Sequence, residues 1–192
     1  MRWVVLLRAV NVGGTKKVPS AALRVAAVAR GFTDPTTYLA SGNLVVSPGT
    51  SEATTSEEVG ALITGELATT LGVETDAVVL DAAGLRQVLT ENPFPDQARD
   101  DPSRLLVAFH PGATGRSGRI DVSSTGPEQV VAAGAVTYLW YPDGSGRSKL
   151  TGPRLERLLG TWSTTRNWRT VLHLAETAAQ ESGDSTGSRS KD

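Results

Sequence analysis

A short stretch near the amino terminus concentrates side chains that can bind an anion. Arg8, Asn11 and Lys16 flank two consecutive glycines in the segment RAVNVGGTKK. Glycine lets backbone N–H groups approach an anion closely, and the basic side chains supply positive charge. The segment lacks the spacing of a P-loop, so it does not predict nucleotide hydrolysis of that type. The alternative is an exposed turn with solubilising lysines.

A second stretch with the same chemistry is DGSGRSKLT, which lies between an expected strand and an expected helix. Backbone N–H groups that enter a helix attract anions, and basic side chains add to this attraction. Arg147, Ser148 and Lys149 are therefore candidate ligand contacts. Ser148 or Thr151 can also simply cap the helix, and both roles are compatible.

The stretch STTRNWRT places two arginines, an asparagine and several hydroxyls together near the end of the chain. Its threonines or Asn167 can cap a helix by accepting from the free N–H groups of the first turn. The helix dipole disfavours a cation in that turn, so Arg166 is more easily explained if it meets a carboxylate or a phosphate. Asp143, Glu156 or another acid could be that partner, and a bound ligand is the alternative. Arg166 and Asn167 are therefore candidate binding residues.

The segment LASGNLVV carries the strongest turn signal in the chain. A hairpin in which Gly42 or Asn43 takes a positive φ accounts for it. Ser41 and Asn43 could also offer hydrogen bonds to a ligand at the hairpin tip. Ser41 is not predicted to be a nucleophile, because no histidine base is linked to it and the GxSxG context is absent.

The elements that must position these side chains follow from hydrophobic periodicity and turn residues. Residues 1–80 read as strand, helix, strand, strand, helix and strand, with Ser56 as the expected cap of the second helix and Gly72 as its end. This order predicts a ferredoxin-like βαββαβ subdomain, a four-stranded antiparallel sheet with two helices on one face.

Residues 81–180 predict a second, smaller α+β subdomain that closes with a helix from about Asn167 to about Gln180. Asp81 is the expected cap of its first helix, and an acidic loop follows that helix through Asp101. Four strands and a short helix, GPRLERLLG, come next. Residues 181–192 contain Ser, Gly and charged residues and predict a flexible tail. The fold class is therefore α+β.

Composition excludes several kinds of chemistry. The 192-residue chain has no cysteine and two histidines, which excludes disulfides, thiol catalysis and zinc–thiolate sites and argues against a His-rich metal site. We predict no metal site and no cofactor. No apolar stretch approaches the 18 residues of a transmembrane helix, so we expect a cytoplasmic protein without a membrane partner.

Charge is distributed unevenly although the formal net charge is only −1. Residues 1–33 contain six basic residues and no acid, and residues 144–173 contain six basic residues and one acid. The segment between them carries five basic and fifteen acidic residues. Two basic blocks that met in space would form a positive cleft between the subdomains. Separate, solvated arginines are the alternative.

Several blocks of the chain resemble a known family. Between residues 3 and 174, in order, they read LLRAVNVGGTKKVPSAALR, TYLASGNLVV, NPF, YLWYPDGSGRSKLT and TTRNWRTVLHL. They are similar to the conserved blocks of the bacterial domain of unknown function 1697 family. Ala9 departs from that pattern, because the family has glycine at this position. The resemblance implies a two-part α+β fold whose first part is ferredoxin-like, and it implies no established activity.

Three classes of function fit these residues. The first is binding of a phosphate- or carboxylate-bearing ligand in the basic cleft between the subdomains. The second is an enzyme acting on a phosphorylated small molecule, although no acid, base or nucleophile stands out. The third is a nucleic-acid-binding or oligomeric interaction protein. Only 5% of residues are aromatic, so stacking of RNA bases on the first sheet would be poor. The sequence does not set the oligomeric state.

Overall fold

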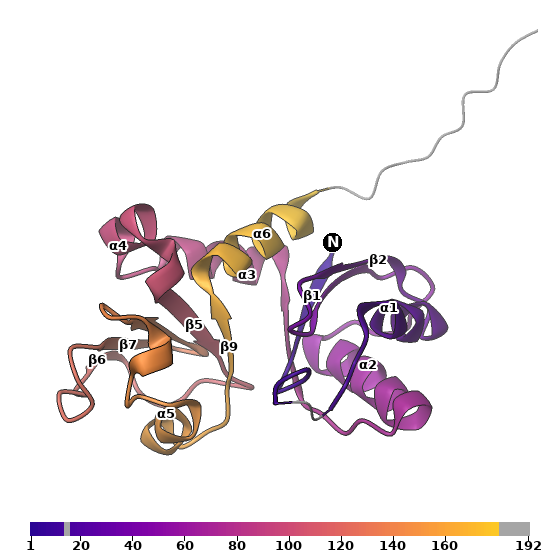
Figure 1. The fold of residues 1–192 in the computed structure, drawn as a ribbon. Helices are drawn as coiled ribbons and strands as arrows, with labels where there is room; N and C mark the ends of the chain where they lie inside the picture. Colours follow the sequence, from indigo (N-terminus) through magenta and orange to yellow (C-terminus); the bar gives the residue numbers. More distant parts are fainter. Residues whose placement is uncertain (14–15, 181–192) are drawn as a thin grey trace, which may run out of the picture.

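Two antiparallel β-sheets form the framework of the molecule in a computed structural model, which describes residues 1–13 and 16–180 (Figure 1). The first sheet has the strand order β2-β3-β1-β4 and contains β1 (Trp3–Leu7), β2 (Thr33–Tyr38), β3 (Asn43–Ser47) and β4 (Ala77–Asp81). The second sheet has the order β6-β7-β8-β5-β9 and contains β5 (Leu105–Phe109), β6 (Gly118–Ile120), β7 (Gln129–Ala133), β8 (Val136–Trp140) and β9 (Thr164–Asn167).

Helices cover the outer faces of both sheets and close the space between them (Figure 1). They are α1 (Ser20–Ala29), α2 (Ser56–Leu71), α3 (Ala82–Thr90), α4 (Pro95–Asp100), α5 (Gly152–Leu159) and α6 (Trp168–Ala179). Helices α1 and α2 pack on the first sheet, α5 packs on the second, and α3 and α6 lie against the inner core that both sheets share. The predicted α+β class is confirmed.

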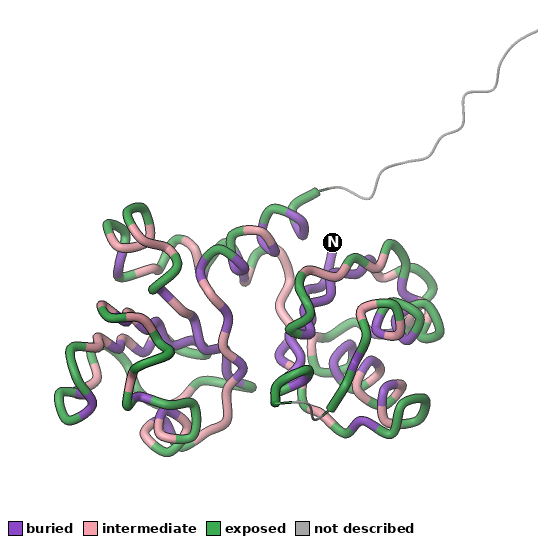
Figure 2. Tube along the Cα trace, in the orientation of Figure 1, coloured by how far each residue is buried: buried purple, intermediate pink, exposed green. Residues whose placement is uncertain are grey.

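The strand β1 explains why two cores meet in this fold. All five of its residues are buried (Figure 2). Alternate side chains point to opposite faces of a sheet. Val4 and Leu6 therefore enter the inner core with residues of the second sheet and α6, whereas Trp3, Val5 and Leu7 pack under α1 and α2. A strand covered on both faces reads as the unbroken apolar run WVVLL.

Two helix starts differ from the sequence prediction. Helix α2 begins after Thr55 rather than Ser56, because the Thr55 hydroxyl accepts from the Glu58 N–H at 3.2 Å while the Glu58 carboxylate accepts from the Thr55 N–H at 3.0 Å. The expected acidic loop before Asp101 contains helix α4, which Pro95 begins at its first position.

The segment STTRNWRT also differs from the prediction. Its residues Thr164–Asn167 form strand β9, and the helix starts only at Trp168. Asn167 is the N-cap, since its side-chain oxygen accepts from the Arg169 N–H at 3.0 Å. Arg166 therefore lies in a strand and not in a helical first turn, so the predicted conflict with the helix dipole does not exist.

The loop after β1 has an unusual backbone. Ala9, Asn11 and Lys16 have φ values of 51°, 57° and 47°. This left-handed region suits glycine and is strained for alanine at position 9. Asn11 closes the loop, because its amide donates to the Val18 carbonyl at 2.9 Å and its oxygen accepts from the Val18 N–H at 2.9 Å.

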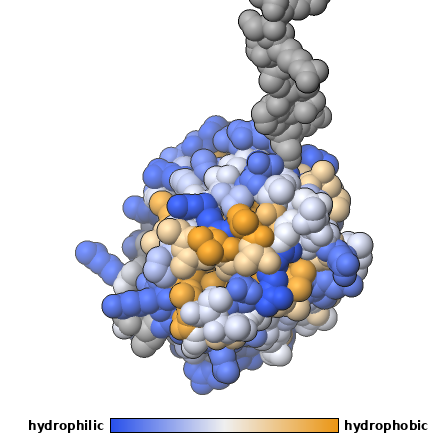
Figure 3. All heavy atoms as spheres, turned by 90° about the vertical axis from the view of Figure 1, so that its right-hand side faces the viewer, coloured by the Kyte–Doolittle hydropathy of each residue, from blue (hydrophilic) through white to orange (hydrophobic). Residues whose placement is uncertain are grey.

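Helix α1 leaves part of its surface apolar. Val25 and Val28 are 68% and 58% exposed, and Leu71 at the end of α2 is 39% exposed. Figure 3 views this side of the molecule and shows apolar residues gathered among polar ones. Single exposed apolar residues are common on protein surfaces, so these residues alone do not indicate a binding site.

Candidate functional site

The predicted binding residues fall into two regions of the molecule. Arg8, Asn11, Ser41, Asn43 and Arg166 come together where the end of β1, the β2–β3 hairpin and β9 meet. Arg147, Ser148 and Lys149 lie in the loop before α5, on the second sheet. Lys16 is exposed on the loop after β1, and Asn167 lies at the start of α6.

Arg166 is at the centre of the first region, which we call the junction. Its side chain is 7% exposed. All of its N–H donors make hydrogen bonds within the protein. Two side chains accept, through the Asn43 amide oxygen and the Thr164 hydroxyl at 2.7 Å. Three backbone carbonyls also accept, those of Thr165 at 3.0 Å, Leu7 at 2.8 Å and Ser41 at 3.1 Å. A guanidinium has five N–H donors, so none remains for a ligand.

Of the two partners considered for Arg166, a protein carboxylate is wrong, and the hydrogen bonds of Arg166 within the protein leave no donor for a bound anion. Its partners are carbonyl, amide and hydroxyl oxygens, and Glu156 pairs instead with Arg8. Burial lowers the pKa of Arg166 to about 10, so the side chain is still a cation at neutral pH. The oxygens of three backbone carbonyls stabilise this charge. Arg166 therefore joins the second sheet to the ends of β1 and β3.

Arg8 makes the second connection between the sheets. Its guanidinium lies 3.1 Å from Glu156 and 3.3 Å from Asp76, and its central carbon lies 5.2 Å from the centre of the Trp162 ring. Glu156 also accepts from the Ser163 N–H at 3.0 Å. Because Glu156 belongs to α5, Arg8 links the loop after β1 to that helix. Its charge is already matched by two carboxylates.

The amide side chains of the predicted site serve the same internal purpose. Asn43 donates to the Tyr38 carbonyl at 2.8 Å and to the Ser41 hydroxyl at 2.9 Å, which fixes the β2–β3 hairpin. Asn167 donates to the Ser103 carbonyl at 2.8 Å and also caps α6. These groups position loops and helix ends, and their hydrogen bonds are made within the protein.

His110 is a buried group close to the junction. Its ring nitrogens lie 3.0 Å from the Thr137 hydroxyl and 3.4 Å from the Trp162 carbonyl. Burial lowers the pKa of His110 below its ordinary value, outweighing the opposing effects of the Trp162 carbonyl and the Glu156 charge. The ring is therefore neutral at pH 7 and belongs to the packed interior of the second sheet.

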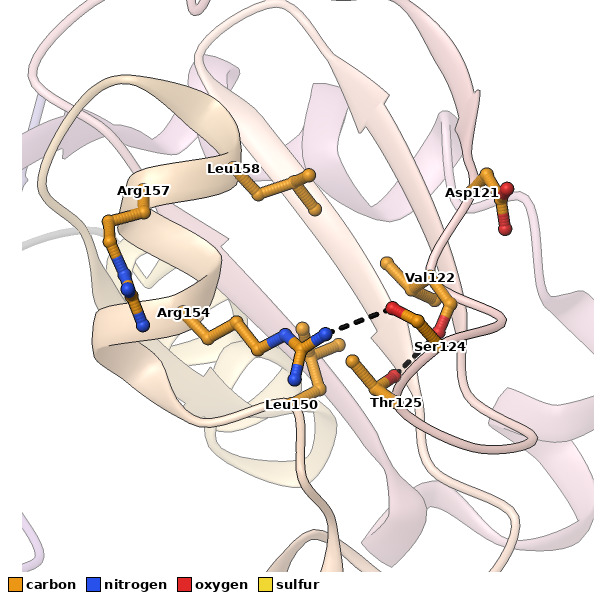
Figure 4. Close-up of a pocket in the computed structure, with 8 residues that line it drawn as sticks. All are labelled: Asp121, Val122, Ser124, Thr125, Leu150, Arg154, Arg157 and Leu158. Carbon is orange, nitrogen blue, oxygen red and sulfur yellow. Dashed lines mark hydrogen bonds between the residues drawn. The ribbon is translucent and has the colours of Figure 1, made fainter.

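A pocket beside α5 has the free charges that the junction lacks. It has a volume of about 490 Å³ and is lined by Asp121, Val122, Ser124, Thr125, Leu150, Arg154, Arg157 and Leu158 (Figure 4). We call it the α5 pocket. Val122, Leu150 and Leu158 give it an apolar floor. Arg154 reaches across it and donates to the Ser124 hydroxyl at 2.9 Å.

An adjoining hollow of about 500 Å³ adds further cations. It contains Arg104, Arg147 and Lys149 and shares Thr125 with the α5 pocket. Within the described chain, no ion pair involves Arg147, Lys149, Arg154 or Arg157. Asp121, Glu128 and Asp143 are the carboxylates of the two hollows, so five basic residues face three acidic ones.

Sequence reasoning missed Arg154 and Arg157 as site residues. Both lie on α5, whose opposite face buries Leu155 and Leu159. Residues three apart on a helix lie on the same side of it, so the spacing of the two arginines already indicated a common basic face. Arg2 was missed for another reason, because its partners, the carbonyls of Thr177 and Asp34, are distant in sequence.

Two further findings hold for the part of the chain that the structure describes. It contains no cluster of three or more His, Asp or Glu side chains that could hold a metal ion. None of its helices is both long enough and apolar enough to cross a membrane.

The two sheets, with α3 and α6 at their shared core, define a two-sheet α+β protein. The solved structure of conserved bacterial protein SP0830 from Streptococcus pneumoniae is similar, with a TM-score of 0.64, 20% identity, and coverage of 92% of this chain and 98% of that one. At this identity the likeness establishes the fold alone. A search of curated proteins found no match.

The family model described as protein of unknown function (DUF1697) matches residues 1–138. The chain belongs to this family, which confirms the resemblance seen in its sequence blocks.

Proposed function

We propose that the protein binds a small anionic ligand in the α5 pocket. The observation that carries the proposal is the pair Arg154 and Arg157, which lie without an acidic partner on the wall of a pocket of about 490 Å³. Arg147 and Lys149 extend the positive charge into the adjoining hollow. The site differs from the cleft expected between the subdomains, where Arg8 and Arg166 already have partners within the protein.

The lining also restricts the chemistry of the ligand. Two guanidinium groups on one face of a helix suit a phosphate or a carboxylate, which each can bind through paired N–H donors. Val122, Leu150 and Leu158 favour a ligand that also has an apolar part.

The proposal includes a division of the chain into two subdomains. Residues 1–80 form a ferredoxin-like unit, and residues 81–180 form the unit that holds the α5 pocket. The element order of the first part and its strand order β2-β3-β1-β4 support this assignment.

Isothermal titration with phosphate, citrate and adenosine monophosphate tests the proposal. We expect adenosine monophosphate to bind best, because it combines an anion with an apolar ring. The double variant Arg154→Gln/Arg157→Gln should weaken its binding about tenfold or more, since two charge-assisted contacts are lost.

The variant Arg86→Gln/Arg116→Gln is the matched control, because it removes the same charge from exposed positions elsewhere. Equal weakening by both double variants would show that net charge alone attracts the anion. That result, or a lack of binding by all three compounds, would overturn the proposal.

A further inference from the structure

Strand β4 has an open edge. It ends the first sheet and pairs on one side with β1. The Arg8 N–H donates to the Asp76 carbonyl, and hydrogen-bonded pairs alternate along an antiparallel ladder. The backbone groups of Ala77 and Val79 therefore point away from β1, towards the outside of the sheet. Among the described residues, neither Ala77 nor Val79 has a hydrogen-bond partner on that side.

A groove runs along this open edge. One hollow of about 290 Å³ lies beside residues 77–80 and is closed on its far side by Phe109, His110 and Pro111. A second hollow of about 420 Å³ lies between α3 and the β7–β8 turn. Both hollows are lined by Leu80, Ala135 and Val136, so they adjoin along this edge, and we call them together the edge groove.

The edge groove is apolar with a negative bias. Most of its lining is formed by alanine, valine, leucine, phenylalanine and proline side chains. Glu57 and Glu91 contribute one carboxylate to each hollow, and no lysine or arginine lines either of them. Both carboxylates lie outside the ion pairs of the described chain. An occupant with apolar side chains and positive charge would therefore complement the groove.

We propose that the edge groove binds an extended, basic segment of a partner protein, which adds to β4 as a fifth strand of the first sheet. Main-chain hydrogen bonds to an open strand edge supply affinity in this mode of recognition, and side-chain pockets supply specificity. The five residues of β4 span about 17 Å, which matches a short extended peptide.

A second copy of this chain fits the groove poorly. The edge of β4 is recessed between α2, α3 and the second sheet, so two such edges cannot approach each other closely. Pairing of two copies would also bring Glu57 and Glu91 near the same carboxylates of the other copy, and like charges across an interface are unfavourable.

Nuclear magnetic resonance with a synthetic probe tests this inference. The probe is acetyl-Lys-Val-Thr-Val-Thr-Val-Lys-amide, which combines alternating apolar residues with positive ends. We expect amide shifts concentrated at Ala77, Val79 and Ala135 and a dissociation constant below about 1 mM. The same peptide, N-methylated at its five central residues, cannot form the ladder and should not bind. Binding of both peptides alike, or no shift in the groove, would overturn the proposal.

Charge-reversed variants test the predicted chemistry of the occupant. Glu57→Lys/Glu91→Lys should weaken binding of the lysine-ended probe about tenfold and favour a glutamate-ended version instead. Glu52→Lys/Glu176→Lys is the matched control at exposed positions away from the groove and should leave binding unchanged. Equal effects of both double variants would contradict the proposal, as would a dimer in solution that the lysine-ended probe fails to dissociate.

Discussion

The junction and the α5 pocket use arginine in opposite ways. Arg166 is buried, and all of its N–H donors make hydrogen bonds to oxygen atoms of five residues of the protein. Arg154 and Arg157 lie along an open pocket and have donors left over. All three come from the basic block near the end of the chain. The comparison shows that basic residues mark a binding site only where the protein leaves their donors unused.

The largest expected effect is on stability at the junction. Arg166→Met should lower the free energy of unfolding by about 3–5 kcal/mol, because it leaves several buried oxygens without donors. Arg154→Gln/Arg157→Gln should change it by no more than about 0.5 kcal/mol. Urea unfolding of the two variants measures both values. Similar losses in both would remove the distinction between the two regions.

The stability of the protein should depend on pH through His110, which lies next to the junction. The pKa of His110 is lowered in the folded protein, so the unfolded chain binds a proton that the folded protein does not. The free energy of unfolding should therefore have its full value above pH 6.5 and should decrease as the pH falls below it. For this one group the decrease is at most about 1.4 kcal/mol per pH unit.

Urea unfolding between pH 7 and pH 5 measures this dependence. His110→Gln should flatten the curve, whereas His173→Gln, which replaces the half-buried histidine of α6 that stacks on Tyr38, is the control. A curve of unchanged slope in His110→Gln would mean that other groups set the acid sensitivity of the fold.

The contact between Arg8 and Glu156 connects the two regions and has a smaller expected effect. A double-mutant cycle with Arg8→Ala and Glu156→Ala should give a coupling energy of about 0.5–1 kcal/mol, because both side chains are only partly buried. The coupling should shrink in high salt. A coupling near zero would show that α5 is held by its apolar face alone.

The smallest expected effect concerns Ala9. Its φ of 51° is strained for alanine, whereas glycine adopts it freely but loses more entropy on folding. Ala9→Gly should therefore change the free energy of unfolding by less than about 1 kcal/mol. Thermal unfolding measures the change, and a large loss would show that the Ala9 methyl group has a packing role.

Local signals predicted much of the fold, because they depend on neighbouring residues. The sequence correctly predicted the apolar strand β1, the capping role of Asp81 and the turn at Gly42, where φ is 74°. The predicted start of α6 was close to the observed one, since Asn167 is the N-cap of the helix. The end of α2 at Gly72 was predicted correctly, whereas its exact start and the short helix α4 were missed, because several adjacent residues can serve as an N-cap.

The contacts of Arg166 were beyond local reasoning. Its partners Asn43 and Leu7 are 123 and 159 residues away in the sequence. Leu7 accepts through its backbone carbonyl, a group that every residue has and that the residue type therefore cannot predict. Charge patterning identified the basic block correctly but did not indicate which of its members were buried. The α5 pocket depends on the loop of residues 121–125 folding against α5, and nothing in the local sequence of either segment predicts that contact.

The two ends of the chain complete the inner core together. Arg2 donates to the Thr177 carbonyl, and residues of α6 pack against Val4 and Leu6 of β1. During synthesis the first sheet therefore emerges from the ribosome long before the helix that covers it. Val4, Leu6, Val45 and Val78 lack the cover that α6 provides over that interval, so part of this apolar face depends on a helix that is made about 160 residues after β1.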